Sequence, residues 1–204
     1  EIHYAAARKK WLWKTSVEYK YAPLRMGQLQ LSGGSVSEDF NPQGITRLNN
    51  AASSLIRGRN YDFLYQKDYF SVENSIEIIN GLTFKTMLEI AQRSGLSNNT
   101  NYTWGKKSLI RDNIFSGDRF DHTAYSAMIV YAPYTYYSIK DGVKKYEKTT
   151  SPAFYLQYKE GFSSWQTNNS QYRKLRGGLI HNIRLGYFDR INYQLEGGTF
   201  IGNT

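Results

Sequence analysis

Few residues of this 204-residue chain combine the types and the spacing that catalysis or metal binding requires. The chain has no cysteine, which excludes disulfides, thiolate metal sites and cysteine nucleophiles together. Its three histidines, His3, His122 and His181, do not fall at metal-ligand spacing. Asp118, Asp121 and His122 lie close together in "SGDRFDH", but without EF-hand or nucleophile-elbow spacing we interpret them as a polar surface loop. We therefore expect no catalytic residues, no metal and no cofactor.

The elements that position the remaining polar residues have the two-residue period of β-strands. The clearest is a hairpin in residues 75–94, "SIEIINGLTFKTMLEIAQRS", in which Asn80-Gly81 supplies the two positive-φ residues of a type I′ turn. Apolar and polar residues alternate in both arms, and the polarity of the arms agrees across the turn. We predict strands over residues 70–79 and 82–92, with one apolar and one charged face. Asn74 interrupts the apolar face.

Another strand is predicted over residues 11–21, "WLWKTSVEYKY". One of its faces carries Trp or Tyr at both ends with smaller residues between them, and the opposite face is rich in charge. This arrangement is typical of a strand that crosses a bilayer, because Trp and Tyr prefer the two membrane interfaces. No run of about 18 apolar residues exists, so the sequence predicts no transmembrane helix.

The connections between strands alternate in length. Further strand patterns begin near Gly27, Tyr125, Pro152, Tyr172 and Ile191, which makes about eight strands in all. The short turns "APLRM", Asn80-Gly81 and "GYFDR" fall at one end of the strands. The long polar stretches near residues 37–68, 94–122 and 161–171 fall at the other end, and residues 41–67 could include a short helix or an ordered loop. Short turns at one end and long loops at the other are typical of outer-membrane barrels. The connection of residues 138–151 does not fit, because it is long and belongs to the short-turn end.

The sequence thus predicts an all-β, antiparallel transmembrane β-barrel with about eight strands visible, part of a larger barrel. Residues 1–204 form a single β-barrel domain or a barrel segment. The residues predicted to face the lumen are Lys14, Glu18, Lys20, Glu73, Glu77, Lys85, Glu89, Gln194 and Glu196. Those predicted to face lipid are Trp11, Trp13, Val17, Tyr19, Ile76, Ile78, Phe84, Leu88, Tyr193 and Leu195.

Two further expectations concern exceptions to this pattern. His181 would face lipid if the alternation ran unbroken through Leu179 and Ile183, which is costly at the membrane centre. We expect a bulge near Gly177-Gly178 that shifts the register, or contact with another subunit. Long charged side chains on the inner face of nearly every strand favour a lumen wider than that of an eight-stranded barrel. We therefore predict that the strands at 11–21 and 191–201 do not pair with each other.

Several segments resemble an uncharacterised Gram-negative outer-membrane family. The best-matched pieces are "RNYDFLY", the "NGL" turn and the "P-x-F-x-L-x-Y-x-x-G" strand at Pro152 to Gly161. In that family a carboxypeptidase-regulatory-like N-terminal domain precedes a barrel similar to the BamA-type assembly factors. The resemblance covers nearly the whole chain from about Trp11. It implies additional strands before and after this portion, and it implies no active-site residues.

The function expected on these grounds is that of a non-enzymatic protein of the cell outer membrane with a role in outer-membrane transport or assembly. Its partners would be outer-membrane lipid and other outer-membrane or periplasmic proteins. The net charge of +9 is spread along the chain, so we expect no nucleic-acid partner. The alternative is a secreted, aromatic-rich β-sandwich that binds carbohydrate on neighbouring rings. A third possibility, a phospholipase-type barrel, needs a Ser, a His and a polar partner on the outer wall, where only His181 fits.

Overall fold

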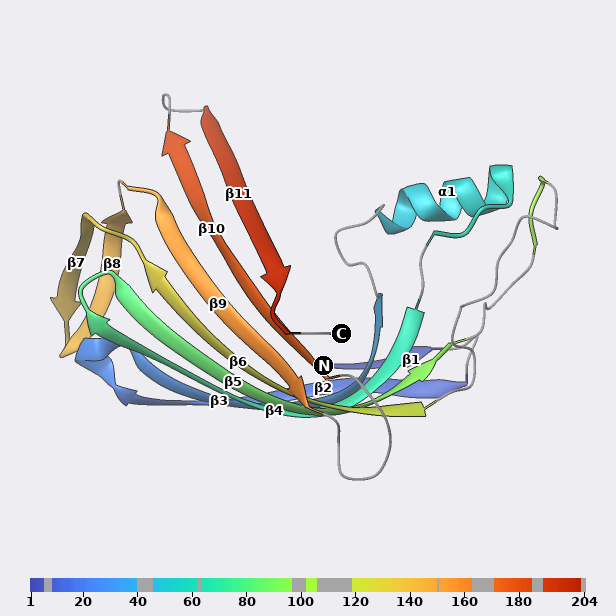
Figure 1. Cartoon of the computed structure of the whole chain (residues 1–204), viewed down its shortest axis with the longest axis horizontal. Helices are drawn as coiled ribbons and strands as arrows, with labels where there is room; N and C mark the ends of the chain where they lie inside the picture. Colours follow the sequence, from blue (N-terminus) through green and yellow to red (C-terminus); the bar gives the residue numbers. More distant parts are fainter. Residues whose placement is uncertain are drawn as a thin grey trace. The chain divides into compact units, whose positions relative to one another are not determined.

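The structure, a computed structural model, is almost entirely β (Figure 1). It describes residues 1–5, 9–39, 46–61, 64–96, 102–105, 119–149, 151–162, 171–184 and 189–202. The strands are β1 (Ile2–Ala5), β2 (Lys10–Ala22), β3 (Gly27–Asp39), β4 (Leu64–Ile79), β5 (Leu82–Gly95), β6 (Arg119–Tyr131), β7 (Thr135–Lys140), β8 (Val143–Thr149), β9 (Ala153–Phe162), β10 (Tyr172–Arg184) and β11 (Arg190–Phe200). A 3-10 turn, η2 (Pro23–Arg25), joins β2 to β3, and a helix, α1 (Arg47–Arg57), lies between β3 and β4.

Nine of these strands form one sheet in the order β1-β2-β3-β4-β5-β6-β9-β10-β11, and β7 and β8 form a separate two-stranded sheet. The eight predicted strands are all present. The strands at 11–21, 70–79, 82–92 and 191–200 correspond to β2, β4, β5 and β11. Sequence analysis missed β1, which pairs with the first half of β2 from Ile2↔Trp13 to Ala5↔Lys10. Each neighbour in the main sheet is also close in sequence, as expected for a chain of consecutive hairpins.

The nine-stranded sheet has two edges within the described residues. β1 and β11 end the strand order, and β2 pairs with β1 and β3 but not with β11. The prediction that the strands at 11–21 and 191–201 do not pair is therefore confirmed. β1 covers β2 only as far as Trp13, with Glu1 and Lys14 bonded through their backbones just beyond. A closed barrel is not present in the described part of the chain, and what the structure supports is an open antiparallel sheet.

The two-residue connection between β4 and β5 is confirmed, but its predicted type I′ geometry is wrong. Gly81 has a φ of +80°, whereas Asn80 does not adopt a positive φ. The type I′ pattern occurs instead in the β7–β8 hairpin, where Asp141 and Gly142 have φ values of +53° and +73°. That hairpin accounts for the long connection that did not fit the alternation of loop lengths, because most of residues 138–151 form its strands.

By their internal contacts the residues divide into two compact units. Unit 1 comprises Glu1–Thr15, Gly33–Phe70 and Ala91–Asp121, and unit 2 comprises Ser16–Ser32, Ser71–Ile90 and His122–Thr204. Both contain parts of the main sheet. The sequence contains no signal for this division into two units, because the dividing points fall within strands.

The short helix allowed for in the 41–67 stretch is α1, in unit 1. Thr46 caps its first turn by accepting a hydrogen bond from the Asn49 backbone N–H at 3.4 Å, and Gly58 ends it with a φ of +66°. The buried Asn50 side chain fixes the chain that follows, since its Oδ1 accepts from the Tyr61 N–H at 2.8 Å. These contacts order α1 and the described residues that follow it, 58–61.

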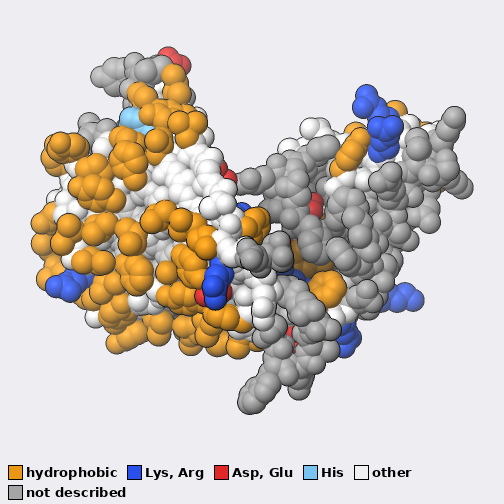
Figure 2. All heavy atoms as spheres, viewed as in Figure 1, with side chains coloured by type: hydrophobic (Ala, Val, Ile, Leu, Met, Phe, Trp, Pro, Cys, Tyr) orange, Lys and Arg blue, Asp and Glu red, His pale blue; other side chains and the backbone are white. Residues whose placement is uncertain are grey.

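Burial in this structure is the reverse of that in a soluble protein. Only three hydrophobic residues are buried among those described, namely Tyr65, Ala91 and Ala124. Eleven polar or charged residues are buried, namely Asn50, Gln66, Lys67, Ser71, Glu77, Glu89, Thr103, His122, Ser126, Thr135 and Lys144. No large side chain is fully buried within the described part, and many large hydrophobic residues are exposed. In Figure 2 hydrophobic side chains cover much of the left-hand part of the molecule with few charges between them. Among the described residues, the side chains buried from solvent are therefore mostly polar and not apolar.

Glycine allows one close crossing on the polar face of unit 2. Tyr155 of β9 is paired with Gly178 of β10, which in turn is paired with Glu196 of β11. The Tyr155 side chain crosses over Gly178 to donate a hydrogen bond to Glu196 at 2.8 Å. A Cβ at position 178 would lie 2.4 Å from the Leu195 carbonyl oxygen and 2.9 Å from the Tyr155 hydroxyl. The contact between β9 and β11 therefore requires glycine at this position.

Replacement of Gly178 by alanine should destabilise the sheet, whereas the same change at Gly197 should not. The added methyl group in G178A meets backbone and tyrosine, and overpacking of this kind costs about 1–3 kcal/mol. In the matched control, G197A, the added group meets nothing within 4 Å. The free energies of unfolding from denaturant titration compare the two. Equal stability of the two variants would contradict the close crossing.

Candidate functional site

The two faces of the sheet differ most clearly over β9, β10 and β11 in unit 2. The strand register places Gln157 beside Arg176, and Leu156 beside Gly177 on the opposite face. Arg176 donates to Gln157 at 2.9 Å, and Gln157 donates to Ser126 of β6 at 3.0 Å. Arg176 also lies 3.9 Å from the Glu196 carboxylate. These contacts form a continuous polar network over four strands, whereas the opposite face exposes Leu156 and Leu195.

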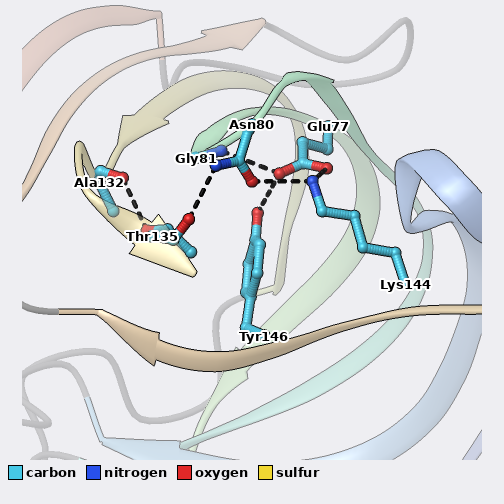
Figure 3. Close-up of polar contacts among 7 residues, drawn as sticks. All are labelled: Glu77, Asn80, Gly81, Ala132, Thr135, Lys144 and Tyr146. Atoms are coloured by element: carbon cyan, nitrogen blue, oxygen red, sulfur yellow. Dashed lines mark hydrogen bonds and ion pairs between the residues drawn. The ribbon is translucent and has the colours of Figure 1, made fainter. Parts of the chain in front are cut away.

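A second, more buried polar cluster lies where the β7–β8 hairpin meets the β4–β5 turn (Figure 3). Its centre is the Glu77 carboxylate, which accepts hydrogen bonds from Lys144 Nζ, from the Tyr146 hydroxyl and, at 2.9 Å, from the Gly81 backbone N–H. Lys144 also donates to Asn80 Oδ1 at 2.9 Å. The side chains of Glu77 and Lys144 are 3% and 6% exposed, so the structure contains a buried ion pair with its hydrogen bonds largely satisfied.

The hairpin is fixed to the sheet by bonds from its base as well. The Asn80 side-chain amide donates to the Thr135 carbonyl oxygen at 2.8 Å, and the Thr135 hydroxyl donates to the Ala132 carbonyl oxygen at 2.7 Å. The Ala132 N–H donates in turn to the Gly81 carbonyl oxygen at 2.8 Å. An added Cβ at Gly81 would lie 2.3 Å from the Ala132 carbonyl oxygen. The turn therefore needs Asn80 for its side chain and Gly81 for its close approach to residue 132.

The local sequence explains why Lys144 and Tyr146 reach the same carboxylate. They are two residues apart on β8, so their side chains share one face of the hairpin. Tyr137 lies opposite Tyr146 in the register, and Lys144 Nζ is 4.1 Å from the centre of its ring. The ammonium group thus lies between a carboxylate and an aromatic face, both of which stabilise a cation.

The chemistry of the cluster is that of a fixed ion pair. Burial, together with the hydrogen bond to the Glu77 carboxylate, raises the pKa of Tyr146 to about 12. Tyr146 therefore stays protonated as a donor throughout the physiological range. Among the described residues, no group of three or more His, Cys, Asp or Glu side chains is placed to hold a metal ion.

The predicted site residues can now be located. Among the predicted lumen-facing residues, Glu77 and Glu89 are buried, Glu73 and Lys85 are half-buried, and Lys14, Glu18, Lys20, Gln194 and Glu196 are exposed. Among the predicted lipid-facing residues, Ile76 and Phe84 are half-buried, and Trp11, Trp13, Val17, Tyr19, Ile78, Leu88, Tyr193 and Leu195 are exposed. Glu77 and Glu196 take part in the two polar networks described above. Glu18 and Lys20 form an exposed pair at 3.2 Å. The assignment of these faces to lumen and lipid stays a prediction.

Sequence analysis did not predict that the Asn80 side chain forms hydrogen bonds, and it did not identify Lys144 or Tyr146 as site residues. A usable signal was present in "YSIKDGVKKY", where Asp141-Gly142 separates two short strands. That signal predicts a hairpin, but it does not reveal which residue the hairpin contacts. Only the fold brings Lys144 to Glu77, 67 positions away.

The expected register shift at Gly177-Gly178 is wrong. β10 and β11 pair without interruption from Lys174↔Phe200 to Arg184↔Arg190, so His181 stays on the apolar face. Its Nδ1 is 3.0 Å from the Tyr193 hydroxyl of the paired residue, and the two rings meet edge to face. Asn74, another polar residue on the apolar face, accepts from the Tyr21 hydroxyl at 2.8 Å. Each of these polar residues is therefore satisfied by a tyrosine, which removes the need for a bulge.

The acidic and histidine residues of "SGDRFDH" do not form a common site in the described residues. Asp118 lies outside them. Asp121 and His122 are consecutive on β6 and so project to opposite faces. Asp121 accepts from Gln92 at 3.2 Å, whereas His122 is buried and stacks on Tyr172 with ring centres 6.1 Å apart.

Fold and site together define a class: an all-β protein built on one large antiparallel sheet with a charged face and an exposed apolar face. The described part contains no helix long and apolar enough to span a bilayer. The model of the C-terminal domain of a family of unknown function (DUF5686) matches residues 1–204, and the chain therefore belongs to that family. Comparison with curated proteins and with solved structures found no match.

The raised pKa of Tyr146 predicts a loss of stability at alkaline pH. The docked hairpin keeps a phenolic proton that a freed Tyr146 releases near pH 10, so docking weakens as the pH rises from 10 to about 12 and is unaffected below. The Y146F variant has no such proton. Unfolding midpoints measured across this range should fall more steeply in the parent protein than in Y146F. Parallel curves for the two proteins would show that Tyr146 is not held by Glu77.

Proposed function

We propose that the chain is a membrane-embedded portion of an outer-membrane β-barrel, with its apolar face toward lipid and its charged face toward an aqueous lumen. The observation that carries the proposal is the reversed burial of polar and apolar side chains. In water, apolar area left exposed on this scale would be strongly unfavourable at about 25 cal/mol per Å². In hydrocarbon the same exposure has no cost, and a closed barrel of strands is one of the two structures that satisfy the backbone there.

Aromatic residues at strand ends support this proposal. The rings of Tyr4 on β1 and Trp11 on β2 contact each other at a tilt of 53°, with centres 4.9 Å apart, and both are at least half exposed. Tyr19 and Tyr21 are exposed toward the opposite end of β2. Rings at both ends of a strand match the two aromatic girdles of membrane barrels.

The two sheet edges support a larger barrel. An edge strand presents unpaired N–H and C=O groups, which hydrocarbon does not tolerate. β2 beyond Lys14 and the outer side of β11 would therefore pair with additional strands in the membrane.

The role we propose is non-enzymatic transport or assembly in the outer membrane, by resemblance to the BamA-type barrels and to proteins with a carboxypeptidase-regulatory-like domain before the barrel. Its partners would be outer-membrane lipid and outer-membrane or periplasmic proteins. The carbohydrate-binding sandwich has less support, because sandwiches require two sheets packed face to face over an apolar core. The described strands instead form one large sheet with three buried hydrophobic residues.

Two adjacent residues on β11 test the sidedness. Leu195 and Gln194 are both exposed, and they project to opposite faces at the middle of the strand. In a membrane, L195R should destabilise the folded protein by about 2–4 kcal/mol, because an arginine near the midplane must leave water. Q194R should cost far less, since arginine there can replace the 2.9 Å hydrogen bond of Gln194 to Glu196 with an ion pair.

The measurement is a folding titration of both variants of the full-length protein in lipid vesicles, with membrane fractionation of the parent as a companion. A soluble protein should lose no more than about 0.5 kcal/mol at either exposed site. Equal costs at the two positions, together with a parent that stays dispersed without detergent, would overturn the proposal.

A further inference from the structure

The β7–β8 hairpin is separated from the main sheet by a break in the strand ladder. β6 and β9 pair as far as Tyr131↔Phe154, and pairing resumes at Thr135↔Thr149 in a different sheet. Pro133 lies in one of the two connecting segments and Pro152 in the other, and proline cannot donate to a ladder. Tyr134 adopts a φ of +55°, which turns the chain at this point. The two connections therefore form a hinge between the sheet and the hairpin.

Beyond the hinge, Lys144 and Tyr146 hold the hairpin to the β4–β5 turn, and β8 also contacts η2. Most of its large side chains are exposed, including Tyr136 at 60% and Ile139 at 56%. Its buried side chains are Thr135, at the hinge, and Lys144, near its far end. A two-stranded hairpin is at best marginally stable by itself in water. The ion pair of Lys144 with Glu77 is thus the buried contact that fixes the far half of the hairpin to the sheet.

The hairpin reaches across several strands. It begins between β6 and β9, its Lys144 and Tyr146 bond to Glu77 at the β4–β5 turn, and β8 contacts η2, the turn between β2 and β3. All of these residues belong to unit 2. A segment that spans this many turns on the charged face lies across the short-turn end of that face.

We propose that the β7–β8 hairpin is a hinged lid over the short-turn end of the charged face, and that the Glu77–Lys144 ion pair is the latch that holds it closed. A buried ion pair adds little stability compared with apolar packing, but loss of one partner leaves the other charge buried and uncompensated. Such a contact is suited to a device with two positions. The inference deepens the proposed function and rests on it for one point, namely that the charged face lines a lumen that the lid closes.

The lid can be followed by distances between two spin labels in the full-length protein. The chain has no native cysteine, so L24C on η2 and K145C on the hairpin would be the labelled sites of this domain. Leu24 and Lys145 are both exposed, so labels are accommodated. E77Q is the test variant, because glutamine keeps an oxygen for the Gly81 N–H and Tyr146 hydroxyl but removes the charge and the oxygen that accepts from Lys144. E73Q is the matched control, since it removes a carboxylate from the same face of the same strand, β4, at a position four residues before Glu77.

The parent protein and E73Q should give a single narrow distance, and E77Q should shift the distribution to longer distances. K144M is a second variant, which removes the other half of the latch without changing the main sheet, and it should shift the distribution in the same direction. Distributions of E77Q and K144M that match that of the parent would overturn the latch.

Ion conductance in planar bilayers separates the lid from the proposed function. If the lid closes a lumen, E77Q should conduct more than the parent and E73Q should not. A shifted distance distribution without a rise in conductance, in a protein for which L195R and Q194R differ as expected, would overturn the lid while leaving the membrane assignment in place. Equal costs of L195R and Q194R would instead defeat the proposed function, whatever the distances show.

Discussion

The structure depends on the need to satisfy charge on one face of a single sheet. Strands β2, β4, β5 and β11 carry long charged side chains that alternate with apolar ones, and a single sheet has no second layer to cover either face. On the charged face the side chains solve this by bonding across strands, as Tyr155 does to Glu196 and Arg176 to Gln157. Where burial is deepest, at Glu77, an additional element supplies the partners.

The same constraint accounts for the position of glycine and tyrosine. Gly178 permits Tyr155 to cross a whole strand, and Gly81 brings the β4–β5 turn against Ala132. On the apolar face two polar residues, Asn74 and His181, each contact a tyrosine hydroxyl. Tyrosine serves both faces because its ring suits an apolar surface and its hydroxyl bonds a polar neighbour. The high aromatic content of the chain follows from this double use.

The hairpin links these local solutions to function. Its Lys144 and Tyr146 donate hydrogen bonds to the Glu77 carboxylate, which also accepts from the Gly81 backbone N–H. The hairpin lies beyond a break in the strand ladder, and each of the two connecting segments contains a proline. An element with its own two-stranded sheet can move as a body, whereas a strand of the main ladder cannot. The charged face and its cover are therefore physically separable parts.

The amino-acid sequence by itself determined most strands of the main sheet and the alternation of polar and apolar residues along them. Alternation at 11–21 and 82–92, the Asn80-Gly81 turn and the rhythm of short and long connections predict eight strands, because these depend on local periodicity. The prediction that the strands at 11–21 and 191–201 do not pair rests instead on the long charged side chains of the inner face and on the family resemblance. Only the tertiary structure decided the turn type at Asn80, the unbroken register through His181 and the contact between Glu77 and Lys144. Each of these depends on a partner far along the chain: Thr135 for Asn80, Tyr193 for His181, and a hinged hairpin for Glu77. Periodicity records which face a side chain occupies, but it carries no information on which distant residue will reach that face.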